Sequence, residues 1–279
     1  MKRNNEGINE MKKYMINEKK QATPSRIVPV TQEAFAKRNN TAITWLGNAG
    51  VLLNIRGTTI LVDPLLLGFD MPLLFKSPLS LDDVTHLDAY LVSHIDNDHF
   101  SRETCSALLP VCKTYHSTQY VSEEMNRSGI RGIGHQIGEG FFVNDVEVTL
   151  TPAKHDWQNG VEKFSYRVWN EEDSCGFWFH TPDGTIWLPG DSRLLDCHLH
   201  MQNPDVILFD FSDNEWHITL DGAIRLANAY PHAKLICIHW GTVDAPDMTP
   251  FNGNPDDLFG KIQNPERICV LWPGEPIII

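Results

Sequence analysis

Apolar residues along most of the chain come in short runs that are separated by glycine, proline and asparagine. Three such runs follow one another from Ala42, namely ITWLG, GVLLNI and TTILVDP, and Arg56-Gly57 stands between the second and the third. Short runs rich in branched and aliphatic residues and bounded by turn residues are typical of strands. The pattern therefore predicts an antiparallel meander with a hairpin turn at Arg56-Gly57.

The rest of the chain shows the same pattern of short apolar runs, and helices are predicted between some of them. Strands are predicted at AYLVS and VCKTY, with helices after Ser101 and near Ser117, and a second β-rich stretch covers VEVTLTP, FSYRVW, CGFWFH and TIWLPG. Strands DVILFDF, KLICIHW and RICVLW then alternate with helices at Thr219 to Tyr230 and near Pro255 to Ile262. Two blocks, each a meander followed by β-α-β, predict an α/β fold of two sheets packed face to face with helices outside.

The first 40 residues differ from the rest. They are rich in Lys, Glu, Asn and Gln, and their apolar positions are Ile8, Met11, Tyr14 and Met15. This spacing predicts an amphipathic helix followed by a linker, which could also serve as a subunit contact. We therefore expect an N-terminal helical extension over residues 1–40 and one large domain over residues 41–279.

Composition narrows the classes of partner. The chain of 279 residues has a formal net charge of −13, which disfavours binding to long nucleic acid and favours a small-molecule substrate. The six cysteines form no C-x-x-C pair, so we expect reduced thiols. Charged first residues and the lack of a long apolar run predict a cytoplasmic protein without membrane insertion.

The densest chemical signal is the loop His94-Ile95-Asp96-Asn97-Asp98-His99, which follows the predicted strand AYLVS. Imidazole and carboxylate groups are common ligands of divalent transition metals. In such a loop, His94 and Asp96 could serve one metal while Asp98 and His99 serve another. The alternative is a polar turn with a helix cap, because Asp and Asn favour such positions without any metal.

Three further residues of ligand type come just after predicted strands. They are His155 after VEVTLTPAK, Asp191 after TIWLPG, and His239 after KLICI. Residues at the carboxyl ends of strands in layered α/β folds converge on one crevice. The joint pattern therefore predicts a metal centre at that edge.

With these motifs in order, the sequence resembles the metallo-β-lactamase superfamily over residues 42 to 279. The matching motifs are Asp63 in LVDP, the H-x-D-x-D-H loop, His155, Asp191 in PGDS, and His239. More narrowly, the chain looks like the branch that contains the L-ascorbate-6-phosphate lactonases, and it is more distantly similar to N-acyl phosphatidylethanolamine phospholipases D. The resemblance implies an αββα sandwich of two mixed β-sheets.

The resemblance also implies which residues hold two divalent metal ions. The first metal would take His94, Asp96 and His155, the second would take Asp98, His99 and His239, and Asp191 would bridge them. Asp63 would orient a ligand histidine through a hydrogen bond, although a simple turn role before Pro64 stays open. Asp96 departs from the commonest family pattern, which has His there. A harder oxygen ligand makes manganese or iron plausible beside zinc.

These expectations lead to a metal-dependent hydrolase in which a metal-bound hydroxide attacks a small ester. Asp191 would orient the nucleophile, and His217 is the candidate acid for the leaving group, with packing at a helix start as its alternative role. Substrate contacts are expected from Arg193, Lys154, Arg102 and Trp240. A lactone or phosphoester of an anionic sugar-like metabolite is the expected substrate, and self-association is expected by analogy with the lactonases.

A non-catalytic metal scaffold or subunit-contact protein is one alternative, which the presence of all seven expected ligands disfavours. Two enzymatic alternatives remain. One is a di-iron redox or oxygen-handling protein, because flavodiiron relatives also carry a carboxylate at the place of Asp96. Those relatives have a flavin domain, for which no room is expected after RICVLWPGEPIII. The other alternative is a phosphodiesterase of the same fold.

Overall fold

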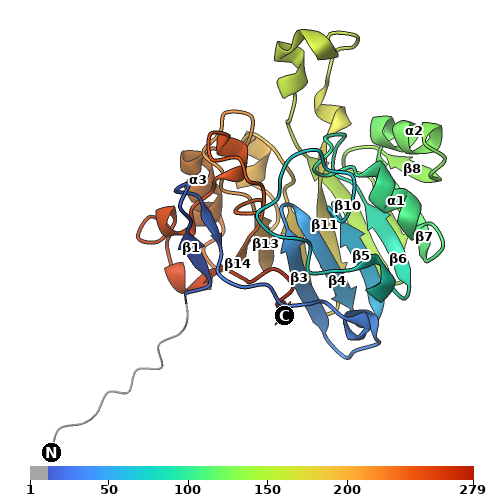
Figure 1. Cartoon of the computed structure of the whole chain (residues 1–279), viewed down its shortest axis with the longest axis horizontal. Helices are drawn as coiled ribbons and strands as arrows, with labels where there is room; N and C mark the ends of the chain where they lie inside the picture. Colours follow the sequence, from blue (N-terminus) through green and yellow to red (C-terminus); the bar gives the residue numbers. More distant parts are fainter. Residues whose placement is uncertain (1–11) are drawn as a thin grey trace, which may run out of the picture.

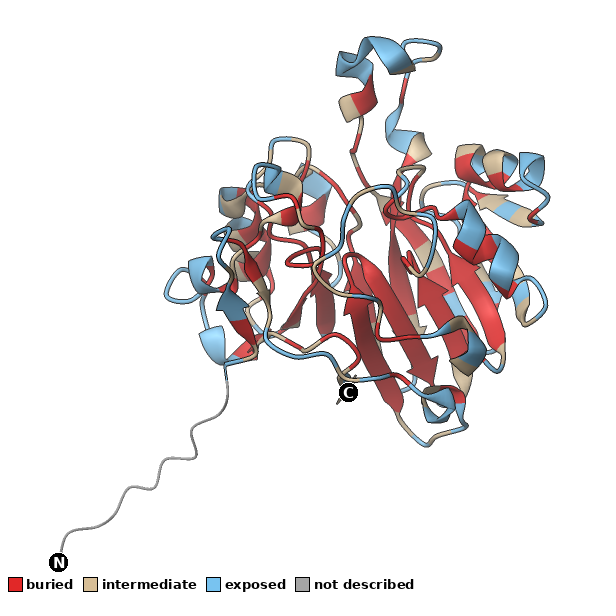
Figure 2. Cartoon of the chain, in the orientation of Figure 1, coloured by how far each residue is buried: buried red, intermediate tan, exposed pale blue. Residues whose placement is uncertain are grey.

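The computed structural model describes residues 12–279, and within them two seven-stranded sheets dominate. The sheets pack face to face, and the helices lie on the outside (Figure 1). Most residues in the strands of these sheets are buried (Figure 2). The predicted α/β sandwich of two mixed sheets is confirmed.

The first sheet contains the predicted opening meander. Its strand order is β16 (Pro276–Ile278), β3 (Thr41–Gly47), β4 (Gly50–Ile55), β5 (Thr58–Val62), β6 (Leu87–Leu91), β7 (Cys112–Thr118) and β8 (Gly132–His135). Pairing is antiparallel from β16 to β5 and parallel from β5 to β8. The predicted turn lies between β4 and β5, where Arg56 and Gly57 both have positive φ angles, of 52° and 103°. Glycine tolerates such an angle at no steric cost.

The second sheet has the same mixed plan. Its order is β15 (Ile268–Cys269), β14 (Lys234–Cys237), β13 (Val206–Phe209), β12 (Gly184–Leu188), β11 (Cys175–Thr181), β10 (Val146–Pro152) and β9 (Gly140–Val143). Strands β9 to β12 pair antiparallel, and β12 to β15 pair parallel. The parallel strands are almost entirely buried, which explains why DVILFDF and KLICIHW read as nearly continuous apolar runs.

Three α-helices cover the sheets within the described residues: α1 (Arg102–Leu108), α2 (Gln119–Arg127) and α3 (Leu220–Ala229). Each begins at a hydroxyl residue, Ser101, Thr118 or Thr219, whose side chain accepts a hydrogen bond from a backbone N–H of the first turn. Helices α1 and α2 pack on the first sheet, while α3 packs with the second sheet. The starts that the sequence predicts for these three helices are therefore correct.

Three local predictions are wrong. Tyr14 and Met15 lie in a strand, β1 (Tyr14–Ile16), which pairs with β2 (Ala22–Pro24); the helix predicted through them is absent there, and Ile8 and Met11 fall outside the described residues. Tyr14 is buried and meets Trp240 edge-on at 5.9 Å between ring centroids, so tertiary packing overrides the weak helical spacing. The run FSYRVW and the predicted helix near 255–262 form only 3-10 turns and bends, including η4 (Glu162–Phe164) and η8 (Pro255–Asp257).

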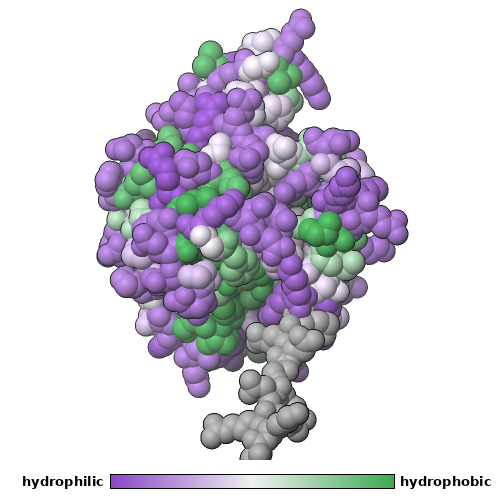
Figure 3. Space-filling view, turned by 90° about the vertical axis from the view of Figure 1, so that its left-hand side faces the viewer, coloured by the Kyte–Doolittle hydropathy of each residue, from purple (hydrophilic) through white to green (hydrophobic). Residues whose placement is uncertain are grey.

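The segment between β10 and β11, residues 153–174, stands out from the body of the molecule, and we call it the lobe. It carries the 3-10 turns η3 (Trp157–Gly160), η4 and η5 (Glu171–Asp173). It projects beyond the sheets in two perpendicular views (Figures 1 and 3). Many of its residues are exposed to solvent (Figure 2). In the part of the chain that is described, no helix is both long and apolar enough to cross a membrane.

Candidate metal centre

The ligand-type residues lie where neighbouring strands end, as the spacing predicts. Asp63 follows β5, the loop from His94 to His99 follows β6, and His155 follows β10. Asp191 comes after β12 and a turn at Gly190, whose φ of 74° and contact with the Cys175 carbonyl leave no space for a side chain. The last member, His239, follows β14. One edge of the sandwich therefore gathers residues from five separate strands.

A first group consists of His94, Asp96 and His155, whose potential ligand atoms lie within 4.8 Å of one another. The Asp96 Oδ2 atom is 3.4 Å from His94 Nε2 and 3.1 Å from His155 Nε2. His94 Nε2 is buried and has no hydrogen-bond partner among the described residues. Since an unpaired buried polar atom costs free energy, this nitrogen requires a partner that the described side chains do not provide.

A second group consists of Asp98, His99 and His239, again within 4.8 Å. The Nε2 atoms of His99 and His239 face each other at 3.3 Å, and Asp191 Oδ2 lies 3.1 Å from the first and 3.2 Å from the second. Asp191 also groups with His94 and His99. It therefore lies between the two groups, at the position expected of a bridging carboxylate.

In the second group, protons on the histidines supply the positive charge that a bound metal ion would supply. Burial lowers the pKa of a histidine, but the carboxylates led by Asp191 outweigh it and raise the pKa of His239 to about 9 and that of His99 well above its usual value. Burial in turn raises the pKa of an acid, yet the facing histidines hold the pKa of Asp98 and Asp191 well below the usual range. Because a bound metal requires neutral imidazole, metal binding here would release protons.

Asp63 makes the contacts expected of an orienting residue. It is fully buried, and its Oδ2 atom lies 2.9 Å from His99 Nδ1. The backbone N–H and the hydroxyl of Ser93 donate to the same carboxylate at 2.8 and 2.5 Å. His99 thus has its Nδ1 atom occupied and its Nε2 atom directed at the cluster.

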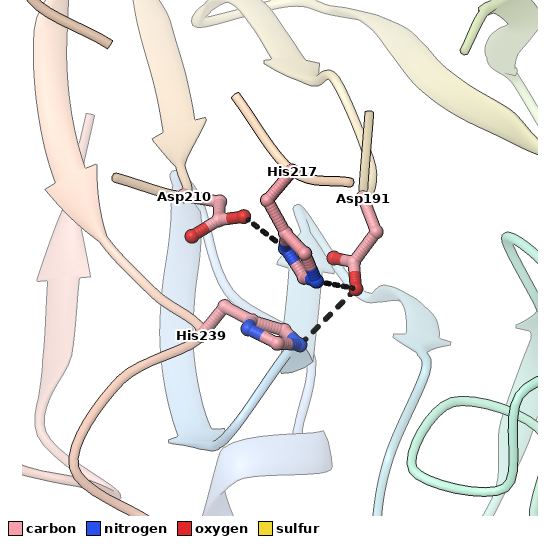
Figure 4. Close-up of side chains that lie close together, drawn as sticks. All are labelled: Asp191, Asp210, His217 and His239. Atoms are coloured by element: carbon pink, nitrogen blue, oxygen red, sulfur yellow. Dashed lines mark hydrogen bonds and ion pairs between the residues drawn. The ribbon is translucent and has the colours of Figure 1, made fainter. Parts of the chain in front are cut away.

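His217 lies at the same cluster and forms a dyad with Asp210, which follows β13. His217 Nδ1 is 2.8 Å from Asp210 Oδ2, and His217 Nε2 is 3.7 Å from Asp191 Oδ2 (Figure 4). Asp210 Oδ1 also accepts hydrogen bonds from the backbone N–H and hydroxyl of Ser212. This firmly held carboxylate fixes the ring of His217 and leaves its Nε2 atom toward the cluster.

Sequence reasoning missed Asp210 and three other polar partners of the cluster. Trp157 Nε1 and Gln158 Nε2 each donate to a different oxygen of Asp96, both at 2.7 Å. Asn48 Nδ2 donates to Asp98 Oδ2 at 3.0 Å. The strand-end rule that found Asp191 could have found Asp210, since DVILFDF ends in the same way; no local signal marks the other three.

A cavity of about 720 Å³ opens onto the cluster and is lined by Asp96, Asp98, His155, Asp191, His217 and His239, among others. Of the four predicted substrate contacts, Arg102 lines it, whereas Arg193, Lys154 and Trp240 do not. Arg193 pairs with Asp156 and covers the Trp216 ring, and Lys154 pairs with Glu171. Trp240 is buried and stacks on Trp45, with ring centroids 5.4 Å apart. The structure does not place these three side chains in the cavity lining, and their contact with a substrate stays a prediction.

Comparison with known proteins agrees with this architecture. The Beta-lactamase superfamily domain matches residues 58–240, and the chain belongs to this superfamily. The superfamily inferred from the motifs is confirmed, while the narrower lactonase branch stays a prediction.

Individual relatives show how far the similarity extends. The chain is 30% identical to a UPF0173 metal-dependent hydrolase of Anoxybacillus flavithermus, over 75% of this chain and 89% of the relative. It is 24% identical to the N-acyl-phosphatidylethanolamine-hydrolyzing phospholipase D 1 of Caenorhabditis elegans, over 76% of this chain and 67% of the relative. In structure it is similar to a possible metal-dependent hydrolase from Veillonella parvula, with a TM-score of 0.69 and 23% identity over 86% of this chain and 100% of the other.

Proposed function

We propose that this protein is a metal-dependent hydrolase that cleaves a small ester at a centre of two divalent ions. The observation that carries the proposal is the convergence of four histidines and three aspartates from four strand ends. The first ion would be held by His94, Asp96 and His155, the second by Asp98, His99 and His239, with Asp191 shared. The metal-dependent hydrolases among the relatives support this reading.

The donor set fits divalent transition metals. The unpartnered Nε2 atom of His94 and the facing Nε2 atoms of His99 and His239 are the nitrogens that such ions take as ligands. Three carboxylates leave a pair of divalent ions with a net charge of about +1, and Asp96 adds a hard oxygen ligand. We propose zinc or manganese, with iron as a further candidate.

When bound, two such ions supply an activated water molecule and polarise the oxygen of the electrophile. The chain contributes orientation and a proton. As the oxygen of the water molecule adds to the carbonyl carbon or phosphorus, the water loses a proton to solvent. The bond to the leaving oxygen breaks, that oxygen takes a proton from His217 Nε2, and His217 regains a proton from solvent. Asp210 holds His217 Nδ1 at 2.8 Å and so keeps the other nitrogen toward the reacting group.

The cavity offers few cationic groups that could bind the expected substrate, a lactone or phosphoester of an anionic sugar-like metabolite. Its cationic side chains are Arg102 and Lys163, and Arg102 is engaged by Glu124 at 3.5 Å and Ser128 at 3.2 Å. The cavity therefore supports the ester chemistry more than it supports an anionic sugar as the substrate. Cytoplasmic location and self-association remain predictions.

Metal analysis followed by an ester screen tests the proposed function. Protein purified without added ions is expected to contain about two equivalents of transition metal and to hydrolyse lactones or phosphodiesters when loaded with zinc or manganese. Asp191→Asn should lower both metal content and turnover. Full metal occupancy with no hydrolysis of any ester would contradict the proposal.

The di-iron alternative has one specific observation in its favour, the carboxylate of Asp96 beside His94 and His155. A redox protein would contain iron as isolated, and its visible spectrum would change on reduction. A colourless zinc or manganese protein with esterase activity excludes it.

A further inference from the structure

The lobe forms an aromatic wall of the cavity. The lining residues that it contributes include Trp157, Phe164, Tyr166 and Trp169. These rings pack edge to face on one another: the centroids of Trp157 and Phe164 are 5.3 Å apart, and those of Tyr166 and Trp169 are 5.9 Å apart. Offset and edge-to-face contacts of this kind are favourable arrangements of aromatic rings.

This wall is not needed to fill the core of the sandwich. Among the described residues, none of the four rings belongs to the apolar clusters between or outside the sheets. The lobe has its own braces: Asn159 exchanges two hydrogen bonds, both of 2.9 Å, with the backbone of Trp169, and Arg167 pairs with Asp173. Trp157 also donates to Asp96, and Trp169 meets Tyr120 of α2 edge-on with ring centroids 5.4 Å apart, so the lobe and its neighbours together hold the rings at the cavity.

A second apolar wall comes from distant parts of the chain. Phe69 and Met71 lie in the loop after β5 and pack with Phe251, and all three line the same cavity. The residues of the candidate metal centre thus form an acidic floor of the cavity. Aromatic rings and the thioether of Met71 form two of its walls. Such walls bury flat apolar groups well, because aromatic and methionine side chains offer large polarisable surfaces.

The polar groups of the lining are largely used within the protein. The Asn97 amide donates to Asp70 at 2.8 Å, and that of Asn214 donates to Thr249 at 2.9 Å. The Gln158 Nε2 atom and the Trp157 indole N–H both donate to Asp96, and Gln158 Oε1 is the buried atom of this group that has no partner among the described residues. A sugar needs several donors and acceptors for its hydroxyl groups, and burying a hydroxyl without a partner is costly. This lining therefore disfavours a polyhydroxylated substrate.

We infer that the substrate of this site is an ester whose acyl or leaving group is aromatic, with the ring held against the wall formed by the lobe. The inference rests on the proposed hydrolase function and specifies its substrate class. Lys163 is exposed, lines the cavity and has its Nζ atom 5.4 Å from the centroid of the Phe164 ring, so a cation lies beside this wall. Phe164 is the residue that most directly sets this specificity, because its side chain lines the cavity without contacting Asp96.

Two six-membered lactones test the substrate class. Dihydrocoumarin carries a fused aromatic ring, whereas glucono-1,5-lactone carries hydroxyl groups. Because the two lactones differ in intrinsic reactivity, the enzymatic kcat/KM of each is divided by the rate of its own hydroxide-catalysed hydrolysis. Zinc- or manganese-loaded protein is expected to favour dihydrocoumarin by about a hundredfold. Phe164→Ala should lower its kcat/KM by about tenfold, mainly through KM, which corresponds to the loss of one aromatic contact. The value for gluconolactone should fall less, so that the preference for dihydrocoumarin becomes smaller.

The matched control is Phe142→Ala, because Phe142 is 68% exposed in β9 and does not line the cavity. It should leave both activities unchanged. If Phe164→Ala disturbs folding, as judged by circular dichroism, Phe69→Ala makes the same test on the second wall. A preference for gluconolactone, or equal losses in the control and the Phe164 variant, would overturn the inference while leaving the hydrolase function intact.

A binding measurement separates the inference from the proposed function. The lactam analogue of dihydrocoumarin resists hydrolysis, and calorimetry should show that it binds metal-loaded protein about tenfold more weakly after Phe164→Ala. Binding of this lactam without hydrolysis of any ester would refute the hydrolase function and retain an aromatic-binding site. Hydrolysis of esters without lactam binding would refute the aromatic specificity alone.

Discussion

Replacing His217 by Gln tests the proton-donor role most directly. The Nδ1 atom of His217 is held by Asp210 at 2.8 Å, and its Nε2 atom lies 3.7 Å from Asp191 Oδ2. The imidazole is thus oriented from one side and faces the reacting groups with the other. Glutamine fills similar space, but it cannot transfer a proton near neutral pH.

The size of the effect follows from the proton transfer that is lost. General acid catalysis by a positioned side chain contributes about a hundredfold to ten-thousandfold, or roughly 3 to 5 kcal/mol of activation free energy. We expect a loss of that size for esters of alkyl alcohols, whose leaving oxygen needs a proton. Esters of 4-nitrophenol leave as a stable anion, so their loss should be less than about tenfold. Asp210→Asn should give a smaller loss with the same dependence on the leaving group.

The assay combines metal analysis with kcat/KM for the two kinds of ester, and the ratio of the two losses is the decisive number. His217 also groups with Asp191, Asp210 and His239 within the reach of one ion. A variant that loses metal together with activity would therefore assign His217 as a ligand. Equal losses for alkyl and nitrophenyl esters would likewise refute the acid role.

Four further outcomes are expected. Trp157→Phe removes the 2.7 Å hydrogen bond to Asp96 and should weaken metal affinity by about tenfold, measured by chelator competition. Asp63→Ala leaves His99 without its acceptor and should lower the free energy of unfolding by about 1.5 to 3 kcal/mol, measured with denaturant. Removing metal with a chelator should lower Tm, by the equivalent of about 4 kcal/mol at a thousandfold excess of free metal over Kd. Burial and His135 lower the pKa of His116 to about 4 from 6.5, so stability should fall by up to about 3 kcal/mol as the pH drops from 6.5 to 4, and His116→Gln should flatten that dependence.

Local patterns in the sequence were sufficient to predict the two sheets and the seven acidic and histidine side chains that cluster at one edge of them. Apolar runs mark strands because a strand that is buried on both faces needs an apolar side chain at nearly every position. Such a run can be recognised from the sequence of the strand alone. Polar residues at strand ends stand out for the same reason, as His155 and His239 do. Because parallel strands bring their carboxyl ends to one edge, a list of strand ends also becomes a list of neighbours.

The tertiary structure alone decided which groups surround that cluster. The strand-end rule could have placed Asp210 at this edge, but it does not predict that Asp210 pairs with His217 or that Trp157 donates to Asp96. The same holds for the cavity walls, which combine the lobe with loops after other strands. It also holds for Trp240, which the sequence placed beside a motif and the packing places in the core. Contacts between distant segments depend on how whole layers pack, and local side-chain periodicity does not encode that packing.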